Sequence, residues 1–232
     1  MDVEFVYFDL DDTLLDHEHA ERQALADVRT RYLEIFGRWS VDELQSTYHS
    51  INSPLWTKYA DGEIEKETVR RQRFERLLDA ADAPHADATL VGRFYIQQYG
   101  EHWRFIPGAR DAFETVADDY GVGVLTNGFA EVQARKFDAF PVLRDRAEAI
   151  VVSEETGALK PDPAVFRHAT ERAGVRAEEV LYVGDSYRSD VKGAENAGWR
   201  VAWYARNGTD GRATNERGFS FGDWEALLER LP

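Results

Sequence analysis

The 232-residue chain contains no cysteine. This absence excludes disulfides, thiolate catalysis, and zinc or iron–sulfur sites built on cysteine. No stretch approaches the roughly 20 apolar residues that a membrane span requires. No basic segment followed by an apolar one precedes the first expected strand, as a secretion signal would. We therefore expect a soluble protein of the cytoplasm that does not bind membranes.

Basic residues are also scarce, because 28 lysines and arginines stand against 43 aspartates and glutamates, for a formal net charge of −15. Such a charge repels polyanions, so we expect no nucleic-acid polymer as a partner. Only five of the basic residues are lysines. An acidic excess with little lysine is typical of proteins from a salt-rich cytosol, where concentrated salt screens the self-repulsion of the chain. The composition thus predicts a halophilic protein.

Hydrophobic residues make up 43% of the sequence and are spread along it, which is enough to build a folded core. Short apolar, β-favouring segments predict five strands, at residues 4–8, 121–125, 149–152, 180–183 and 200–204. Helical patterns separate the last four of these strands. This alternation predicts an α/β protein with a Rossmann-like, doubly wound and mainly parallel sheet.

A long segment without strand character lies between the first two expected strands. It covers roughly ninety residues, far more than a normal crossover connection. Within it, Phe74, Leu77, Leu78 and Ala81 have the spacing of one apolar helix face. We therefore expect an inserted helical domain at residues 16–106, and an α/β core made of residues 1–15 and 107–232.

The first expected strand runs directly into three carboxylates within four positions, Asp9, Asp11 and Asp12. Unpaired buried carboxylates are costly, so these side chains must be solvated, hydrogen-bonded or bound to a cation. Taken alone, the motif fits an acidic turn as well as it fits a metal site.

Polar side chains also follow three later strands. Thr126 and Asn127 follow the second strand, Lys160 lies beyond the third, and Asp185 and Asp190 follow the fourth. Each of these ends has a plain structural reading as an Asn-Gly turn, a solvated lysine or a helix N-cap. In an open parallel sheet, however, the carboxyl ends share one edge, where ligands bind. Carboxylates from two strands, one lysine, and hydroxyl and amide donors are together typical of Mg²⁺ facing a phosphate.

The order of these residues along the chain resembles the order of the motifs in a known family. The series Asp9-x-Asp11-x-Thr13, Thr126-Asn127-Gly128, Lys160-Pro161, and Gly184-Asp185 with Asp190 resembles the four motifs of the haloacid dehalogenase-like (HAD) hydrolase superfamily. The helical insert lies where that superfamily carries a type 1 cap. The segments 52–56, 61–64, 126–129 and 153–157 look most like the branch of pyrimidine 5′-nucleotidases and N-acylneuraminate-9-phosphatase.

The resemblance implies a Mg²⁺-dependent phosphomonoesterase that hydrolyses a small phosphorylated metabolite, first of all a nucleoside 5′-monophosphate, through an aspartyl-phosphate intermediate. Asp9 would be the nucleophile, and Asp11 would protonate the leaving oxygen and later activate water. Magnesium would be held by the carboxylates of Asp9 and Asp185 and by the backbone carbonyl of Asp11.

The resemblance also assigns the remaining polar residues of this edge. Thr126, Asn127 and Lys160 would bind the transferring phosphoryl group, and Lys160 would also keep Asp9 ionised during catalysis. Asp190 would not contact the phosphoryl group itself but would orient water or Lys160.

The cap would close over this edge, exclude water and select the leaving group. Residues that could contact the leaving group are Trp56, Tyr59, Arg73, Tyr95 and Trp103. Packing within the cap is the alternative role for each of the aromatic residues, and ion pairing along a helix surface is the alternative for Arg73.

Enzymes of other functions share this set of motifs in whole or in part. A phosphomutase of the same fold and a sugar-phosphate or phosphoglycolate phosphatase would use the same motifs. A 2-haloacid dehalogenase is disfavoured, because that branch uses no metal and has no aspartate at the position of Asp11. A binding protein without activity is disfavoured because all the expected catalytic groups are present. We expect a monomer or a homodimer.

Overall fold

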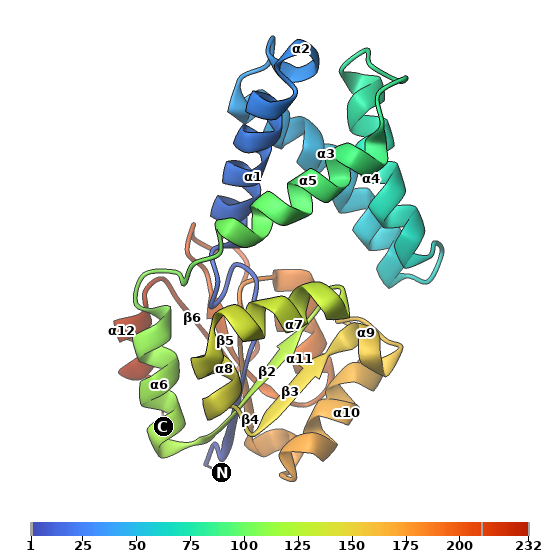
Figure 1. Ribbon diagram of the computed structural model, residues 1–232. Helices are drawn as coiled ribbons and strands as arrows, with labels where there is room; N and C mark the ends of the chain where they lie inside the picture. Colours follow the sequence, from blue (N-terminus) through green and yellow to red (C-terminus); the bar gives the residue numbers. More distant parts are fainter. Residues whose placement is uncertain (1, 210, 232) are drawn as a thin grey trace. The chain divides into compact units, whose positions relative to one another are not determined.

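The computed structural model describes residues 2–209 and 211–231. They form two compact units (Figure 1). One unit contains the residues up to Asp16 together with those from Phe105 onward, and the other is His17–Arg104. The second unit is therefore an insertion in the sequence of the first.

The first unit contains a six-stranded sheet in the order β3-β2-β1-β4-β5-β6, in which every described pairing is parallel. The strands are β1 (Phe5–Phe8), β2 (Gly121–Thr126), β3 (Ala149–Val152), β4 (Val180–Gly184), β5 (Arg200–Tyr204) and β6 (Phe219–Phe221). The predicted doubly wound, parallel α/β fold is confirmed. The sequence patterns did not predict β6, which is only three residues long.

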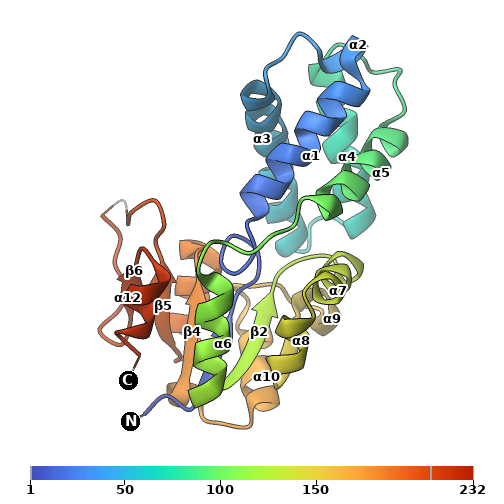
Figure 2. The same cartoon turned by 60° about the vertical axis from the view of Figure 1, so that its left-hand side comes forward.

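Helices cover both faces of this sheet (Figure 2). They are α6 (Ala109–Asp119), α7 (Ala130–Ala139), α8 (Pro141–Arg146), α9 (Ser153–Thr156), α10 (Pro163–Ala173), α11 (Lys192–Asn196) and α12 (Trp224–Leu228). Side chains alternate along a strand, so Val6 and Phe8 pack into the cluster that includes residues of α6, α7, α8 and α12. Phe5 and Tyr7 pack into the opposite cluster, with residues of α10 and α11.

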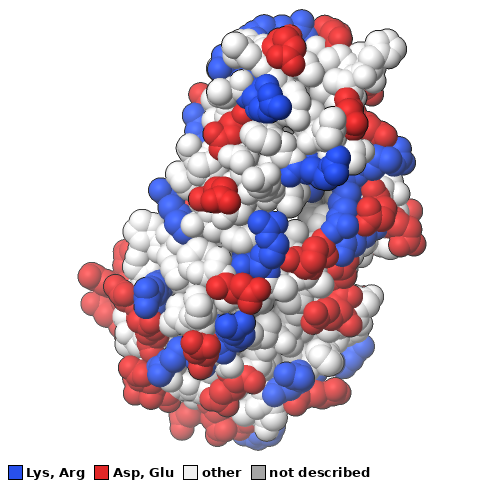
Figure 3. Space-filling model, viewed as in Figure 1, with Lys and Arg blue, Asp and Glu red and all other residues white. Residues whose placement is uncertain are grey.

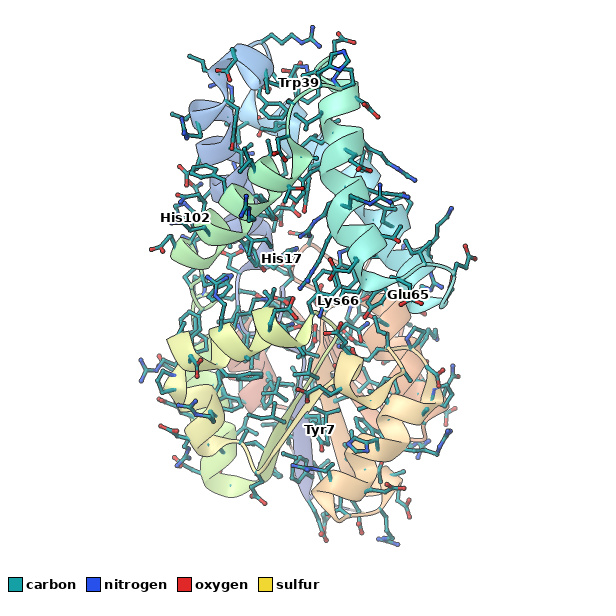
Figure 4. The ribbon with its side chains drawn as sticks, turned by 45° about the vertical axis from the view of Figure 1, so that its right-hand side comes forward. Tyr7, His17, Trp39, Glu65, Lys66 and His102 are labelled. Carbon is teal, nitrogen blue, oxygen red and sulfur yellow. The ribbon has the colours of Figure 1, made fainter. Side chains whose placement is uncertain are left out.

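Buried side chains hold the central strand β1 in place. The ring of Tyr7, which Figure 4 labels, stacks on Trp199 at 5.3 Å between centroids. Its hydroxyl donates to the carbonyl of Ala169 at 2.7 Å. In register, Phe8 is opposite Val124 of β2 and Val183 of β4. The residues that follow these three strands therefore emerge side by side at one edge of the sheet.

The second unit is helical throughout. Its helices are α1 (His17–Arg31), α2 (Leu33–Phe36), α3 (Val41–Ala60), α4 (Lys66–Ala80) and α5 (Ala88–Glu101), and within His17–Arg104, all of which is described, there is no strand. Helix α1 packs against α5, and α3 packs against α4. Phe74, Leu77 and Leu78 are buried on one side of α4, as their spacing indicates. This unit thus has a hydrophobic core of its own.

One histidine near each end of the helical unit contacts a side chain of α1 or α5; Figure 4 labels the two, His17 and His102. At the start of α1, Nδ1 of His17 lies 2.7 Å from the hydroxyl of Tyr99 on α5. Just after α5, Nε2 of His102 lies 2.6 Å from a carboxylate oxygen of Asp27 on α1. These contacts hold together the first and last helices of the unit.

The acidic excess is concentrated in the sheet-containing unit. His17–Arg104 contains 15 acidic and 12 basic residues, whereas the remainder of the chain contains 28 and 16. On the face that Figure 3 presents, acidic side chains are most frequent over the lower part, which belongs to the sheet-containing unit. Among the described residues, no helix has the length and apolar character needed to cross a bilayer.

Candidate active site

Asp9 follows β1 directly and is only 7% exposed. Its backbone N–H continues the sheet by donating to the carbonyl of Val183 at 2.8 Å, which fixes the position of the residue. The side chain accepts a hydrogen bond from Nζ of Lys160 at 2.7 Å. Burial raises the pKa of the Asp9 carboxyl to about 7, because the ammonium of Lys160 only partly offsets the loss of water and the nearby Asp190 adds repulsion.

Lys160 is the centre of a buried hydrogen-bond network and is only 2% exposed. Its Nζ donates to Asp9 at 2.7 Å, to the hydroxyl of Tyr182 at 2.7 Å and to Asp190 at 2.8 Å. These three acceptors use all three protons of an ammonium group. Burial by itself would lower the pKa of Lys160, but Asp190 and Asp9 more than offset this and raise it. Lys160 is therefore a charged group with two carboxylate partners.

The side chain of Tyr182 completes this network from within β4. Its hydroxyl accepts from Lys160 and donates to the backbone carbonyl of Leu125 at 2.7 Å. Tyr182 could not be identified as a site residue from the sequence, because a tyrosine inside an apolar strand is indistinguishable from a packing residue. Only the tertiary structure brings its hydroxyl to Lys160.

Asp185 follows β4 and is held at both its side chain and its backbone. The hydroxyl of Thr13 donates to a carboxylate oxygen at 3.1 Å, and the indole N–H of Trp203 donates to the backbone carbonyl at 2.9 Å. Burial raises the pKa of Asp185 well above its ordinary value, and the charges of Asp190 and Asp9 raise it further. The site therefore contains more buried negative charge than Lys160 alone balances.

Asp190 is fully buried and uses both carboxylate oxygens within the protein. Lys160 donates to one oxygen at 2.8 Å, and the backbone N–H of Ser186 donates to the other at 2.9 Å. A β-carbon at Gly184 would lie 2.6 Å from this carboxylate, so the end of β4 requires glycine for Asp190 to fit. The Asp190 carboxylate thus holds Lys160 with one oxygen and the loop after β4 with the other.

The donor set fits a hard divalent cation. One oxygen each of Asp9, Asp185 and Asp190 lies within 4.8 Å of the others. The contacts described for Asp9 and Asp185 use one oxygen of each carboxylate, whereas both oxygens of Asp190 accept hydrogen bonds from the protein. Oxygen ligands and surplus negative charge suit Mg²⁺. Asp9 and Asp185 therefore fit as ligands, and Asp190 fits as a support for them.

Thr126 and Asn127 are next to this cluster at the end of β2. The buried hydroxyl of Thr126 donates to the carbonyl of Asn127 at 3.2 Å and accepts from Nε2 of Gln133 at 3.0 Å. The side-chain amide of Asn127 forms two hydrogen bonds with the backbone of Lys160, at 3.0 and 2.8 Å. The Asn127 side chain therefore connects the end of β2 to the loop that carries Lys160.

The carboxylate of Asp11 is held by α7. Nζ of Lys136 lies 2.6 and 2.7 Å from its two oxygens, and Nε2 of Gln133 lies 3.0 Å from one of them. The adjacent Asp12 has a φ of +59°, in the left-handed region that aspartate tolerates better than most residues. The site predicted from the sequence does not include Lys136 and Gln133, although their i, i+3 spacing and the rarity of lysine are a signal that could have singled them out.

Two of the five cap residues named from the sequence, Arg73 and Tyr95, are buried inside the helical unit. Nη1 of Arg73 donates to the hydroxyl of Tyr48 at 3.3 Å. Its guanidinium carbon lies 5.0 Å from the ring centre of Phe74 and 5.7 Å from that of Tyr95. The contacts described for Arg73 thus lie within its own unit.

The other three cap residues, Trp56, Tyr59 and Trp103, are half-buried. Trp56 and Tyr59 pack edge to face with 5.7 Å between ring centres. Trp103 packs in the same way against Tyr99 at 5.6 Å. These three side chains keep some surface outside the core of the helical unit.

Comparisons with known proteins extend across both units. A family model described as haloacid dehalogenase-like hydrolase matches residues 3–198. Pyrimidine 5′-nucleotidase YjjG of Escherichia coli (strain K12) is 28% identical over 201 residues, which cover 86% of this chain and 85% of that protein. Pyrimidine 5′-nucleotidase PynA of Streptococcus pneumoniae (strain ATCC BAA-255 / R6) is 28% identical over 231 residues, which cover 98% and 94%. Among solved structures, magnesium-bound HAD-hydrolase YfnB of Bacillus subtilis, described as revealing interdomain movement, has a TM-score of 0.82 at 28% identity and covers 100% of this chain and 99% of that one.

Proposed function

The chain belongs to the haloacid dehalogenase-like hydrolases, and we propose that it is a Mg²⁺-dependent phosphomonoesterase for small phosphorylated metabolites, with nucleoside 5′-monophosphates as the first substrate class. The observation that carries this proposal is the buried network at the carboxyl edge of the sheet, in which Lys160 bridges Asp9 and Asp190. It joins a candidate nucleophile to a charged phosphate-binding donor. The pyrimidine 5′-nucleotidases among its relatives support the nucleotide class.

In the proposed reaction, an oxygen of Asp9 forms a bond to phosphorus while the bond from phosphorus to the leaving oxygen breaks. Asp11 gives its proton to that leaving oxygen. Asp11 then accepts a proton from a water molecule that attacks the aspartyl-phosphate, and inorganic phosphate leaves as Asp9 is restored. Asp9 suits the first step because Lys160 engages only one of its carboxylate oxygens.

The carboxylates of Asp9 and Asp185, with the backbone carbonyl of Asp11, are the groups that would hold Mg²⁺. When bound, the ion neutralises charge on the phosphoryl oxygens. Thr126, the backbone N–H of Asn127 and Lys160 would donate to the same oxygens. The three protons of Lys160 are donated to Asp9, Tyr182 and Asp190. To bind a phosphoryl oxygen, Lys160 would have to give up one of these three acceptors.

The helical unit His17–Arg104 is the proposed cap that selects the leaving group. Trp56, Tyr59 and Trp103 are its remaining specificity candidates, since the described contacts of Arg73 and Tyr95 are internal to the unit. We place the enzyme in a salt-rich cytoplasm, where it would act as a monomer or a homodimer.

The test is phosphate release from a panel of nucleoside 5′-monophosphates, sugar phosphates and phosphoglycolate, with Mg²⁺ or with EDTA, at low and at multimolar KCl. We expect release that depends on Mg²⁺, is fastest with a pyrimidine nucleotide and is abolished by Asp9→Asn. Asp12→Asn is the matched control, because asparagine accepts the left-handed backbone at this position. It should retain most of the activity.

Other results would contradict the proposal. Absence of phosphate release from every compound in the presence of Mg²⁺ would exclude a phosphatase of this class. Conversion of a sugar phosphate to an isomer without matching phosphate release would indicate a phosphomutase. Chloride release from a 2-haloacid without Mg²⁺ would indicate a dehalogenase.

A further inference from the structure

Lys136 is a second buried lysine of the sheet-containing unit, and it contacts a different aspartate from Lys160. It is 2% exposed, and its Nζ lies 2.6 and 2.7 Å from the two oxygens of Asp11. The Asp11 side chain is 25% exposed, so it has solvent on one side and Lys136 on the other. A buried ammonium needs a partner, and an ammonium that contacts both oxygens restricts the rotation of the carboxylate.

Gln133 holds the same carboxylate from one helical turn away. Residues at i and i+3 lie on the same face of a helix, so Gln133 and Lys136 together present this face of α7 to Asp11. Nε2 of Gln133 lies 3.0 Å from Asp11, from the hydroxyl of Thr126 and from the carbonyl of Asn127. One amide thus links the proposed proton donor to the proposed phosphate donors.

The oxygen of the Gln133 amide indicates that this side chain acts as a hydrogen-bond donor. Its Oε1 is buried and has no hydrogen-bond partner among the described residues. A β-carbon at residue 128 would approach Nε2 to 2.5 Å, so Gly128 leaves the room that this amide needs. The side chain is therefore placed for its Nε2 contacts.

We propose that Lys136 and Gln133 are positioning residues that fix the carboxylate of Asp11 relative to the phosphate donors of Thr126 and Asn127. This inference rests on the proposed function, in which Asp11 delivers a proton to the leaving oxygen. Proton transfer requires the donor to be within hydrogen-bond reach of its acceptor. Loss of Lys136 lets the Asp11 side chain adopt other rotamers, and proton delivery then suffers more than phosphate binding does.

The leaving group provides the test. p-Nitrophenolate leaves without a proton, whereas an alkoxide leaves only with one, so the two esters differ in their need for Asp11. The value of kcat/KM covers all steps up to the departure of the leaving group. We expect Lys136→Met and Asp11→Asn to lower kcat/KM about tenfold or more for the best nucleoside monophosphate and less than about threefold for p-nitrophenyl phosphate.

Three further variants make the result specific. Arg135→Met removes a positive charge from the exposed side of the same helix and should leave both values unchanged. Lys136→Arg keeps the charge and should restore part of the selective loss. Gln133→Met removes the second donor to Asp11 but keeps Lys136, so it gives an independent measurement if Lys136→Met does not fold. It should change the ratio of the two values in the same direction.

The outcomes separate this inference from the function on which it rests. If the wild-type protein hydrolyses neither ester with Mg²⁺, both are wrong. If Asp11→Asn is selective while Lys136→Met and Gln133→Met lower both values equally, α7 has only a structural role and the positioning inference alone is overturned.

Discussion

Asn127 and Lys160 hold each other through two hydrogen bonds, although 33 residues separate them in sequence. Nδ2 of Asn127 donates to the carbonyl of Lys160 at 3.0 Å, and the N–H of Lys160 donates to Oδ1 of Asn127 at 2.8 Å. The end of β2 thereby fixes the backbone from which the Lys160 side chain extends. Only a side chain with one donor and one acceptor can make both bonds.

Asn127→Asp should therefore break one of these bonds and disturb both strand ends. The substitution replaces the donor with an oxygen that repels the Lys160 carbonyl. We expect a loss of about 1–3 kcal/mol in the free energy of unfolding, as for a polar group left without its partner. We also expect weaker binding of inorganic phosphate. Urea unfolding and phosphate titration measure the two effects, and the exposed Asn207→Asp is the control for the added charge. Equal stability of the two variants would contradict this account.

Lys160→Met should destabilise the protein more strongly. It leaves the buried carboxylates of Asp9 and Asp190 side by side without their shared cation. Loss of one partner from a buried ion pair costs about 3–5 kcal/mol, which urea unfolding can measure. Addition of Asp190→Asn removes one uncompensated charge, so the double variant should be more stable than Lys160→Met alone. Additive losses in the double variant would show that the charges are not coupled.

The predictable part of the fold follows from local patterns. The segment Phe5–Phe8 is apolar throughout and is buried on both faces, so it could be recognised as a central parallel strand. Phe219–Phe221 could not be recognised, because three residues with serine in the middle carry too little periodicity. The exact ends of strands also varied, since β4 extends through Gly184.

The predictable part of the site follows from topology. Asp9, Asp185 and Lys160 could be expected together, because parallel strands deliver their carboxyl ends to one edge. The rarity of lysine and the i, i+3 spacing from Gln133 could single out Lys136, but its partner could not be assigned, because the contact with Asp11 spans 125 residues. Tyr182 is a similar case, because its hydroxyl acquires a role only when β4 lies beside the Lys160 loop.

Arg73→Met tests whether this arginine packs the helical unit or contacts substrate. The buried guanidinium of Arg73 donates to the hydroxyl of Tyr48 and lies over the rings of Phe74 and Tyr95, so its removal leaves the buried hydroxyl without this donor and the rings without this contact. We expect a loss of about 1–3 kcal/mol in the free energy of unfolding, with kcat/KM of the folded enzyme unchanged. The exposed Arg71→Met on the same helix should change stability by no more than about 0.5 kcal/mol. A large rise in KM without a loss of stability would instead assign Arg73 to the substrate.

Magnesium should stabilise the protein more at high pH than at low pH. In the metal-free protein, burial raises the pKa of Asp9 from 3.8 to about 7, and the pKa of Asp185 is also raised. Between these limits the folded state binds more protons than the unfolded chain, so stability decreases as the pH rises from about 4 through about 7. A divalent cation replaces those protons as the compensating charge. It should therefore raise the melting temperature strongly at about pH 8 and little at about pH 5, where protons compete with it.

Thermal unfolding at a fixed KCl concentration, with Mg²⁺ or with EDTA, measures this dependence. Asp185→Asn removes one proposed ligand and one of the buried carboxyls with a raised pKa. Its metal-free form should accordingly lose less stability between about pH 5 and about pH 8 than the wild type, and its response to Mg²⁺ should be smaller. A Mg²⁺-induced shift in melting temperature that is the same at both pH values would mean that the ion does not bind at the buried carboxylates. The surplus negative charge at Asp9 and Asp185 would then need another partner.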